Sequence, residues 1–196
     1  MIVKDEEIVL KEFLNSVKDY VDEIVIVDTG SKDNTKSIAL EFTLKIFDFE
    51  WSDDFSAARN FSISKATGEW ILILDADEVI SKDDLLKIKT IIEDDNYLGY
   101  RFIQETYHGD ELVSTRGICR LFQNNKGIKF VYPIHETVRN SILELNEKIG
   151  KTGIVIRNNA QYSKEKKDYY VSLINKKIKQ FPNSNAVREL ELQKAG

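Results

Sequence analysis

The sequence predicts an α/β fold in which a Rossmann-like mixed sheet is flanked by helices, extended by antiparallel strands and followed by C-terminal helices. Three observations predict this fold. Apolar runs alternate with amphipathic stretches over the first 80 residues, aromatic and β-branched segments follow from residue 97, and helical spacing of apolar residues returns after residue 163. We therefore expect one main domain over residues 1–162 and a helical appendage over residues 163–196.

The first half of the chain predicts parallel strands joined by helices. Apolar residues at helical spacing between Glu7 and Val21 indicate a surface helix. The run EIVIVDTGS (23–31) is continuous and apolar, which indicates a strand buried on both faces. The elements predicted after it are a helix capped by Ser31 or Asp33 and ending near Phe42, a strand over 44–50, a helix from Asp53 or Asp54 that ends before Gly68, and a strand over 70–77. Helices between parallel strands form right-handed crossovers.

The second half predicts antiparallel strands that extend or flank the parallel sheet. Its segments are rich in aromatic and β-branched residues, and the sequences HGD and QNNKG between them are turn signals. The predicted strands cover residues 97–107, 111–122, 127–134 and 153–162. The tail has apolar residues at helical spacing and predicts helices that could pack against a second copy of the chain.

Composition and charge restrict the classes of function. The net charge of −5 disfavours a nucleic-acid partner, because binding a phosphate backbone requires a basic surface. No apolar run approaches the length that crosses a bilayer, and the N-terminal MIV is followed at once by charged residues, unlike a signal peptide. We expect a cytoplasmic protein. Cys119 is the single cysteine, so no internal disulfide is expected and no chemical role is assigned to it.

Carboxylates gather where two of the predicted strands end. The strand WILIL runs into Asp75-Ala76-Asp77-Glu78, and the apolar run over 23–31 runs into Asp28. Ligands of open α/β sheets bind outside the carboxyl ends of the strands. In extended geometry Asp75 and Asp77 point to the same side, and clustered carboxylates repel one another unless a cation such as Mg²⁺ or Mn²⁺ neutralises them. A metal held there can bridge diphosphate oxygens, although a single D-x-D can also arise by chance in a chain with 33 acidic residues.

Several motifs in the same order resemble a known family. The segments DEIVIVDTGSKDNTKSIA, FEWSDDFSAARNFSISKATGEWILILDADE and RLFQNNKGIKFVYPIHE are similar to those of family 2 glycosyltransferases with the GT-A fold. They resemble in particular the bacterial subgroup with W-x-x-D-F-S-x-A-R-N before the D-x-D, which includes enzymes that glycosylate peptide cysteines. The resemblance covers roughly residues 1–136. It implies a metal-dependent, inverting transfer of a hexose from a nucleotide-sugar, with a UDP-hexose as the expected donor, to a peptide, glycan or lipid-linked acceptor.

The resemblance also implies roles for individual residues. Met1 to Glu6, including Val3 and Asp5, would line the nucleotide base, and Asp28 would hydrogen-bond the uracil or ribose. Arg59 and Asn60 would lie near the nucleotide, although Arg59 could instead pair with Asp53 or Asp54. Asp75 would bind ribose or metal with Ala76 leaving space beside it, and Asp77 would bind the metal and through it the diphosphate. Glu78 could also cap the next helix.

The segment PIHE forms a second chemical cluster. His135 could be a further metal ligand or a structural imidazole, and Glu136 could deprotonate the acceptor. Asp110 and Glu105 are other candidates for this base. Relatives carry a late histidine where this chain has Asn158 and Asn159, and their first strand is longer.

Two other classes of function fit parts of the sequence. A degenerate, non-catalytic domain that binds nucleotide or glycan would explain the short first strand and the late asparagines. The run ILILDADEV also fits the D-x-D-x-V motif of haloacid-dehalogenase-like phosphatases, where Asp75 would be the nucleophile. That motif normally lies on the first strand, whereas here three strand–helix units precede it.

Overall fold

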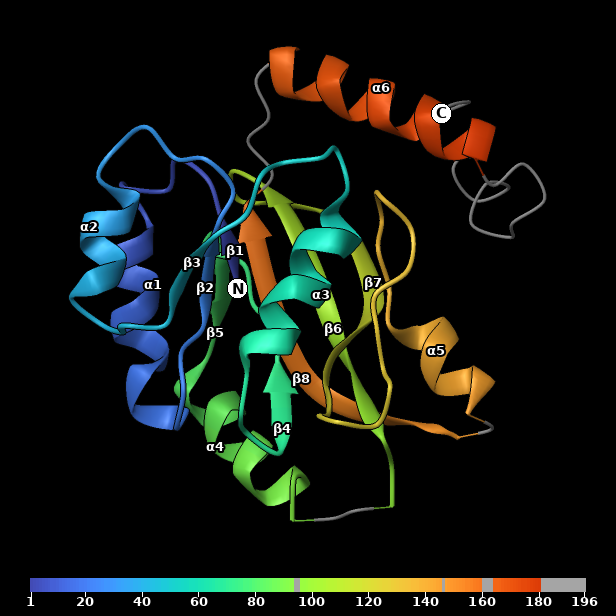
Figure 1. The fold of residues 1–196 in the computed structure, drawn as a ribbon. Coiled ribbons are helices and arrows are strands. Elements are labelled where there is room, and N and C mark those ends of the chain that lie inside the picture. Colours follow the sequence, from blue (N-terminus) through green and yellow to red (C-terminus); the bar gives the residue numbers. More distant parts are fainter. Residues whose placement is uncertain (94–95, 146, 160–163, 181–196) are drawn as a thin grey trace.

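The computed structural model describes residues 1–93, 96–145, 147–159 and 164–180 as an α/β fold with two sheets (Figure 1). The elements of the first part are β1 (Ile2–Val3), α1 (Leu10–Val17), the 3-10 helix η1 (Lys18–Tyr20), β2 (Ile26–Asp28), α2 (Thr35–Leu40), β3 (Ile46–Asp48), α3 (Phe55–Lys65), β4 (Trp70–Leu72), β5 (Glu78–Ile80) and α4 (Lys82–Ile91). The second part contains β6 (Gly99–His108), β7 (Glu111–Gln123), α5 (Arg139–Glu144), β8 (Ile149–Asn159) and α6 (Lys164–Gln180). No helix in these ranges is long and apolar enough to cross a membrane.

The first sheet confirms the predicted parallel strands. Its order is β1-β2-β3, and all pairs are parallel, with Val3 opposite Asp28 and Asp28 opposite Asp48. The strand β2 is buried along its whole length, as its continuous apolar run predicts. Helices α1 and α2 lie together beside this sheet, and α3 contacts β1 and β2 (Figure 1). The carboxyl ends of β1 and β2 therefore open at the same edge.

The second sheet has the order β4-β7-β6-β8-β5. The strands β6 and β7 form the predicted hairpin, and β8 adds to β6 in parallel. The strand β4 was predicted to continue the parallel sheet, but it pairs antiparallel with β7. It ends at Leu72, five residues before the predicted end at Asp77, because the chain turns at Asp75, whose carbonyl accepts the amide of Glu78 at 3.1 Å.

The predicted strand over 127–134 is wrong. Within it only Val131 forms an isolated bridge, to Thr137. Positive φ angles at Gly127 (75°) and Tyr132 (79°) break the extended backbone. The side-chain amide of Asn60 donates to the carbonyl of Phe130 at 2.9 Å and accepts its amide at 2.8 Å, so a side chain supplies the hydrogen bonds that a neighbouring strand would give.

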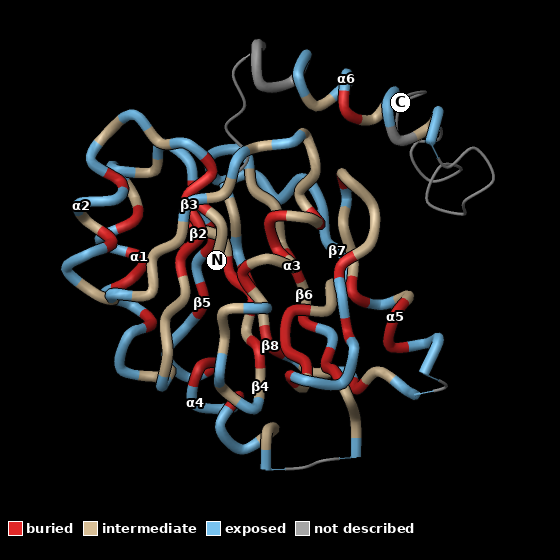
Figure 2. Tube along the Cα trace, viewed as in Figure 1, coloured by how far each residue is buried: buried red, intermediate tan, exposed pale blue. Residues whose placement is uncertain are grey.

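Two groups of buried side chains form the core. One packs α1, β2 and α4 against the inner face of β6 and β8, and includes Leu14, Leu85 and Phe102. The other joins β4 and β7 to the loop before α5, and includes Phe122, Phe130 and Ile142. Buried residues follow the strands through the middle of the molecule, while the helices expose their outer faces (Figure 2).

Candidate active site

A cleft of about 2280 Å³ lies where β1 and β2 end. Val3, Lys4 and Thr29 line it from the first sheet, and the turn after β4 contributes Asp75, Ala76 and Asp77. The remaining walls come from the loop before α5, from α5 itself, from the strands β6 to β8 and from one side of α6. The cleft therefore lies at the sheet edge that the sequence predicts for a ligand.

Arg59 reaches the floor of this cleft from α3. The carboxylate of Asp54 caps that helix by accepting the amide of Ala57 at 3.0 Å, as one of the two predicted caps. The guanidinium of Arg59 is buried and donates to both oxygens of Asp75, with Nη1 to Oδ1 at 2.9 Å and Nη2 to Oδ2 at 3.0 Å. Its Nε donates to Oε1 of Glu136 at 2.5 Å. Arg59 therefore pairs with neither Asp53 nor Asp54, and all three of its nitrogens contact carboxylates.

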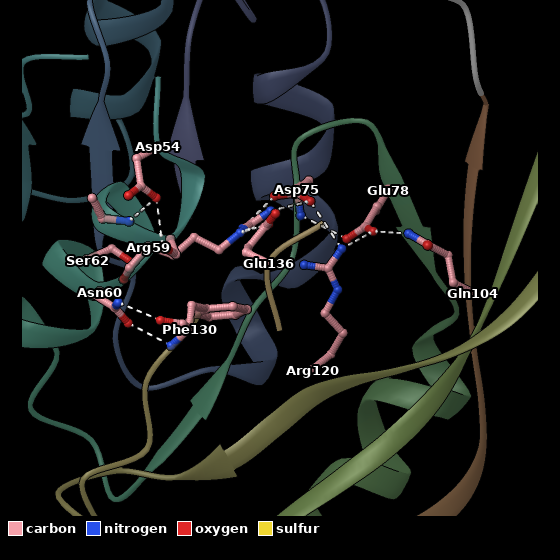
Figure 3. A network of polar contacts seen from close by, with 12 residues as sticks. Asp54, Arg59, Asn60, Ser62, Asp75, Glu78, Gln104, Arg120, Phe130 and Glu136 are labelled. Atoms are coloured by element: carbon pink, nitrogen blue, oxygen red, sulfur yellow. Dashed lines mark hydrogen bonds and ion pairs between the residues drawn. The ribbon is translucent and has the colours of Figure 1, made fainter. Parts of the chain in front are cut away.

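A second arginine, Arg120 of β7, contacts the same carboxylate. Its Nη2 donates to Oδ2 of Asp75 at 3.2 Å and to Oε1 of Glu78 at 2.7 Å (Figure 3). Glu78 also accepts the amide of Asp75 at 2.9 Å and the side-chain amide of Gln104 at 2.8 Å. Glu78 therefore does not cap the next helix, and Ser81 does so by accepting the amide of Asp84. We call Arg59, Asp75, Glu78, Arg120 and Glu136 the arginine–carboxylate network.

The network sets the charges at the cleft floor. Burial raises the pKa of Asp75, but the guanidiniums of Arg59 and Arg120 outweigh burial and hold that pKa below its usual range. Burial dominates at Glu78 and raises its pKa, although Arg120 acts in the opposite direction. Two guanidiniums thus face three carboxylates, and the Nε of Arg120 is a buried donor with no hydrogen-bond partner in the structure.

The Asp75-Ala76-Asp77 segment does not have the extended geometry that the sequence predicts. Ala76 and Asp77 are the central residues of the turn, so the two carboxylates are not related by the alternation of a strand. Asp75 is directed at the arginines, whereas Asp77 is exposed and lines the cleft. Ala76 is buried and lines the cleft.

Asp75, Asp77 and His135 are the cleft residues that the sequence predicts as ligands of a divalent ion. Among the described residues no group of three or more His, Cys, Asp or Glu side chains is placed to hold a metal ion. Both oxygens of Asp75 already accept hydrogen bonds from arginines, so binding of a metal ion to Asp75 would break these hydrogen bonds. Asp77 and His135 are exposed in the same cleft. A Mg²⁺-type ion needs only one or two protein carboxylates when a diphosphate and waters complete its shell, so these two residues fit such an ion.

The predicted catalytic pair lies in the loop before α5. His135 has a positive φ of 52°, and it lines the cleft together with Glu136. The other two candidates for the base lie elsewhere. Glu105 contacts Arg157 and the hydroxyl of Tyr107, and Asp110 lies in the turn of the β6–β7 hairpin.

The predicted nucleotide-binding residues divide into two groups. Val3, Glu6, Arg59, Asp75 and Ala76 line the cleft. Asp5, Asp28 and Asn60 do not. Asp5 accepts the amide of Lys32 at 2.7 Å, and Asn60 holds the backbone of Phe130. Asp28 is buried, and its Oδ1 accepts the amides of Gly30 and Ser31 at 2.9 Å, while its Oδ2 has no hydrogen-bond partner in the structure.

Sequence reasoning missed two parts of the cleft. Arg120 is the single charged residue in the apolar stretch GICRLF, which is the signal that could have indicated it. The other part is the side of α6, where the hydroxyl of Tyr169 accepts from Nε1 of Trp51 at 2.6 Å and donates to Asp53 at 2.7 Å. Nothing in the local sequence pairs residues 118 positions apart. Cys119 also lines the cleft, but burial raises the pKa of its thiol to about 12, which argues against a nucleophilic role.

Comparison with known proteins identifies the family. The sequence model described as glycosyl transferase family 2 matches residues 1–170. The chain belongs to this family. It is 42% identical over 147 residues to a TPR repeat-containing protein of Synechococcus elongatus, covering 75% of this chain and 36% of that protein. It is 36% identical over 146 residues to the SPbeta prophage-derived glycosyltransferase SunS of Bacillus subtilis, covering 71% of this chain and 34% of SunS. The chain thus spans about a third of the length of these relatives.

Solved structures of glycosyltransferases share the fold of this family 2 chain. TarS of S. aureus in complex with UDP-GlcNAc superimposes with a TM-score of 0.65 at 16% identity, over 94% of this chain and 66% of TarS. The mannosyltransferase PcManGT of Pyrobaculum calidifontis in complex with GDP-Man and Mn²⁺ superimposes with a TM-score of 0.64 at 16% identity, over 91% of this chain and 62% of that structure. The fold is therefore GT-A, as the motifs predict.

Proposed function

We propose that this family 2 chain transfers a hexose from a nucleotide-sugar, with UDP as the nucleotide, to an acceptor by direct displacement with inversion. The observation that carries the proposal is the arginine–carboxylate network on the floor of a cleft at the carboxyl ends of β1 and β2. Relatives of the same fold bind UDP-GlcNAc and GDP-Man, which supports a nucleotide-sugar as the donor.

Each part of the cleft has a role in this reaction. The donor nucleotide lies against Val3, Lys4 and Thr29. Asp77, with His135, would hold a divalent ion, and such an ion supplies positive charge to the departing diphosphate. The arginines fix Asp75 at the start of that turn, because three of their hydrogen bonds end on its carboxylate. The Nε of Arg120 is a further donor that has no hydrogen-bond partner in the structure.

Glu136 is the candidate base for the acceptor. One of its oxygens accepts from Arg59, which fixes the carboxylate at the cleft wall. A base in an inverting transfer takes a proton from the attacking atom within hydrogen-bond reach. Since Glu105 and Asp110 do not line the cleft, Glu136 is the predicted residue that geometry favours. Inversion follows from a single displacement, through an oxocarbenium-like state.

Calorimetric titration of UDP with and without Mn²⁺ tests the donor site. We expect UDP to bind more tightly with Mn²⁺, and we expect Asp77→Ala to lose this Mn²⁺ dependence. Asp83→Ala is the matched control, because Asp83 is an exposed acid of α4 outside the cleft. The proposal is wrong if UDP does not bind, or if Asp77→Ala keeps the full effect of Mn²⁺.

The sequence also suggested two alternative functions, a non-catalytic binding domain and a phosphatase. A non-catalytic binder would bind UDP-sugars without hydrolysis or transfer, so turnover of a donor panel distinguishes it from the enzyme. The phosphatase interpretation is wrong, because the chain belongs to glycosyl transferase family 2. The contacts agree, since the proposed nucleophile Asp75 has both oxygens engaged by guanidiniums.

A further inference from the structure

Two cations of the cleft lie directly opposite each other on neighbouring strands of the second sheet. Arg101 of β6 pairs with Lys151 of β8, so both side chains point to the same face of the sheet. Both residues line the cleft and are exposed. We call Arg101 and Lys151 the basic wall.

The charges of the basic wall are not compensated by acids. Like charges directly opposite each other on neighbouring strands destabilise a sheet. No ion pair among the described residues joins Arg101 or Lys151 to a carboxylate, whereas other exposed cations such as Lys36 and Arg157 do pair with acids. Glu144 and Glu147 line the same cleft and form no ion pair with the basic wall. In a chain of net charge −5, an uncompensated cationic wall indicates an anionic ligand.

Gly117 of β7 leaves room for one side chain of the basic wall. Arg101 fills the space above Gly117, where a Cβ atom would lie 2.6 Å from its Cδ and Nε. A side chain at position 117 would displace Arg101, so glycine keeps the guanidinium against β7. Arg116 belongs to the other face of the sheet, because it lies opposite Gln104, three residues along β6 from Arg101. Its Nε donates to Oε1 of Gln104 at 2.6 Å.

We propose that the basic wall binds a carboxylate or phosphate group of the acceptor. The proposal rests on the proposed function and names the chemical class of its acceptor. The donor diphosphate is assigned to the turn at Asp77, whereas the basic wall lies on β6 and β8. Both sites line the same cleft, which also contains Glu136. An anionic group on the wall would hold the rest of the acceptor between the donor and Glu136.

Binding of small anions to UDP-saturated protein tests the proposal. Saturating UDP occupies the donor diphosphate site, so a second anion reports on the wall. The probes are glycerol 3-phosphate, glycerate and uncharged glycerol, each titrated by NMR at constant ionic strength. We expect one or both anions to bind and glycerol not to bind. In Arg101→Gln/Lys151→Gln we expect the anion affinity to fall about tenfold or more, as for lost charge-assisted hydrogen bonds.

A matched control separates the wall from overall charge. Lys126→Gln/Lys129→Gln removes the same charge from exposed positions outside the cleft and should bind the anions as the unaltered protein does. The inference is overturned if the Arg101/Lys151 variant binds the anions normally, or if no anion binds the UDP-loaded protein. Failure of UDP itself to bind would refute the donor assignment, and the acceptor interpretation with it.

Discussion

Asp75 shows at the scale of one residue how burial and pairing compete. Burial opposes its charge, yet its carboxylate accepts three hydrogen bonds from the guanidiniums of Arg59 and Arg120, and its amide donates a fourth hydrogen bond to Glu78. A buried ion pair adds little net stability by itself, but removal of one partner leaves an uncompensated charge. We therefore interpret the network as a device that fixes the turn rather than as a source of stability.

The pKa of Asp75 predicts how stability depends on pH. A carboxyl group whose pKa is lowered in the folded state stabilises the fold above the pKa of the unfolded chain, and this contribution is lost as pH falls toward the lower, folded value. We expect the unaltered protein to lose stability below about pH 4, near the ordinary Asp pKa. The side chain in Asp75→Asn cannot titrate, so this variant should lose less stability as the pH falls. The midpoints of urea unfolding between pH 7 and pH 2 measure the stability of both proteins. Parallel curves of midpoint against pH for the two proteins would contradict the prediction.

The residue scale also shows what the sequence could and could not predict. The motif places Asp75, Asp77, Arg59 and Glu136 near one site, and the structure brings all four to the cleft. Their pairings were not predictable, because Arg59 and Glu136 are 77 positions apart and the choice among several nearby acids depends on packing. The extended geometry assumed for Asp75 and Asp77 was wrong because the hydrogen bond from Glu78 closes a turn there.

At the scale of elements, α6 forms one wall of the cleft. Leu173 of this helix is 1% exposed, and Tyr170 stacks on Phe55 of α3 with ring centroids 6.1 Å apart. The hydroxyl of Tyr169 connects Trp51 and Asp53, and Lys176 also pairs with Asp53. The helical tail was predicted from apolar spacing, and its residues after Gln180 lie outside the described part of the chain. No local sequence pattern predicted the contact of α6 with the cleft.

These contacts predict the effect of a single hydroxyl on α6. Tyr169→Phe removes the acceptor for Trp51 and the donor to Asp53, and a hydrogen bond contributes about 0.5–1.5 kcal/mol. We expect amide hydrogen exchange in residues 170–178 to become about two- to tenfold faster while exchange in β6 and β7 is unchanged. Lys179→Ala, an exposed position on the same helix, is the control. Equal exchange in Tyr169→Phe and in the unaltered protein would show that α6 is held by its apolar contacts alone.

Strand prediction succeeded or failed at this scale for a physical reason. A continuous apolar run identified β2, and aromatic and β-branched composition with a turn signal identified the β6–β7 hairpin. The segment 127–134 has the same composition but forms a loop, because the side chain of Asn60 satisfies its backbone. The partner of β4 was also predicted wrongly, since an apolar strand does not specify whether its neighbour is parallel or antiparallel.

For the whole molecule, the two core groups support different parts of the cleft. Val3 and Ala76 belong to the first group and line the donor side. Phe130 belongs to the second group, and its ring lies 5.6 Å from the guanidinium of Arg59. The arginine–carboxylate network therefore adjoins both groups, since Arg59 lies against Phe130 and Asp75 is followed by Ala76. Damage to one group should affect the site differently from damage to the other.

Two large-to-small substitutions test this division. Phe122 is fully buried against Phe130, with ring centroids 6.2 Å apart. Leu85 is a buried residue of α4, a helix that lies at the end of the molecule opposite α6 (Figure 1) and contributes no residue to the cleft. Phe122→Ala and Leu85→Ala should each lower the free energy of unfolding by about 2–5 kcal/mol, through lost burial and a residual cavity. Phe122→Ala releases the support beneath Phe130 and Arg59, whereas Leu85→Ala leaves a cavity away from Val3 and Ala76, so only Phe122→Ala should bind UDP more weakly. Urea unfolding and calorimetric titration of folded protein measure the two effects. Equal loss of UDP affinity in both variants would show that the site depends on overall stability and not on the second core group.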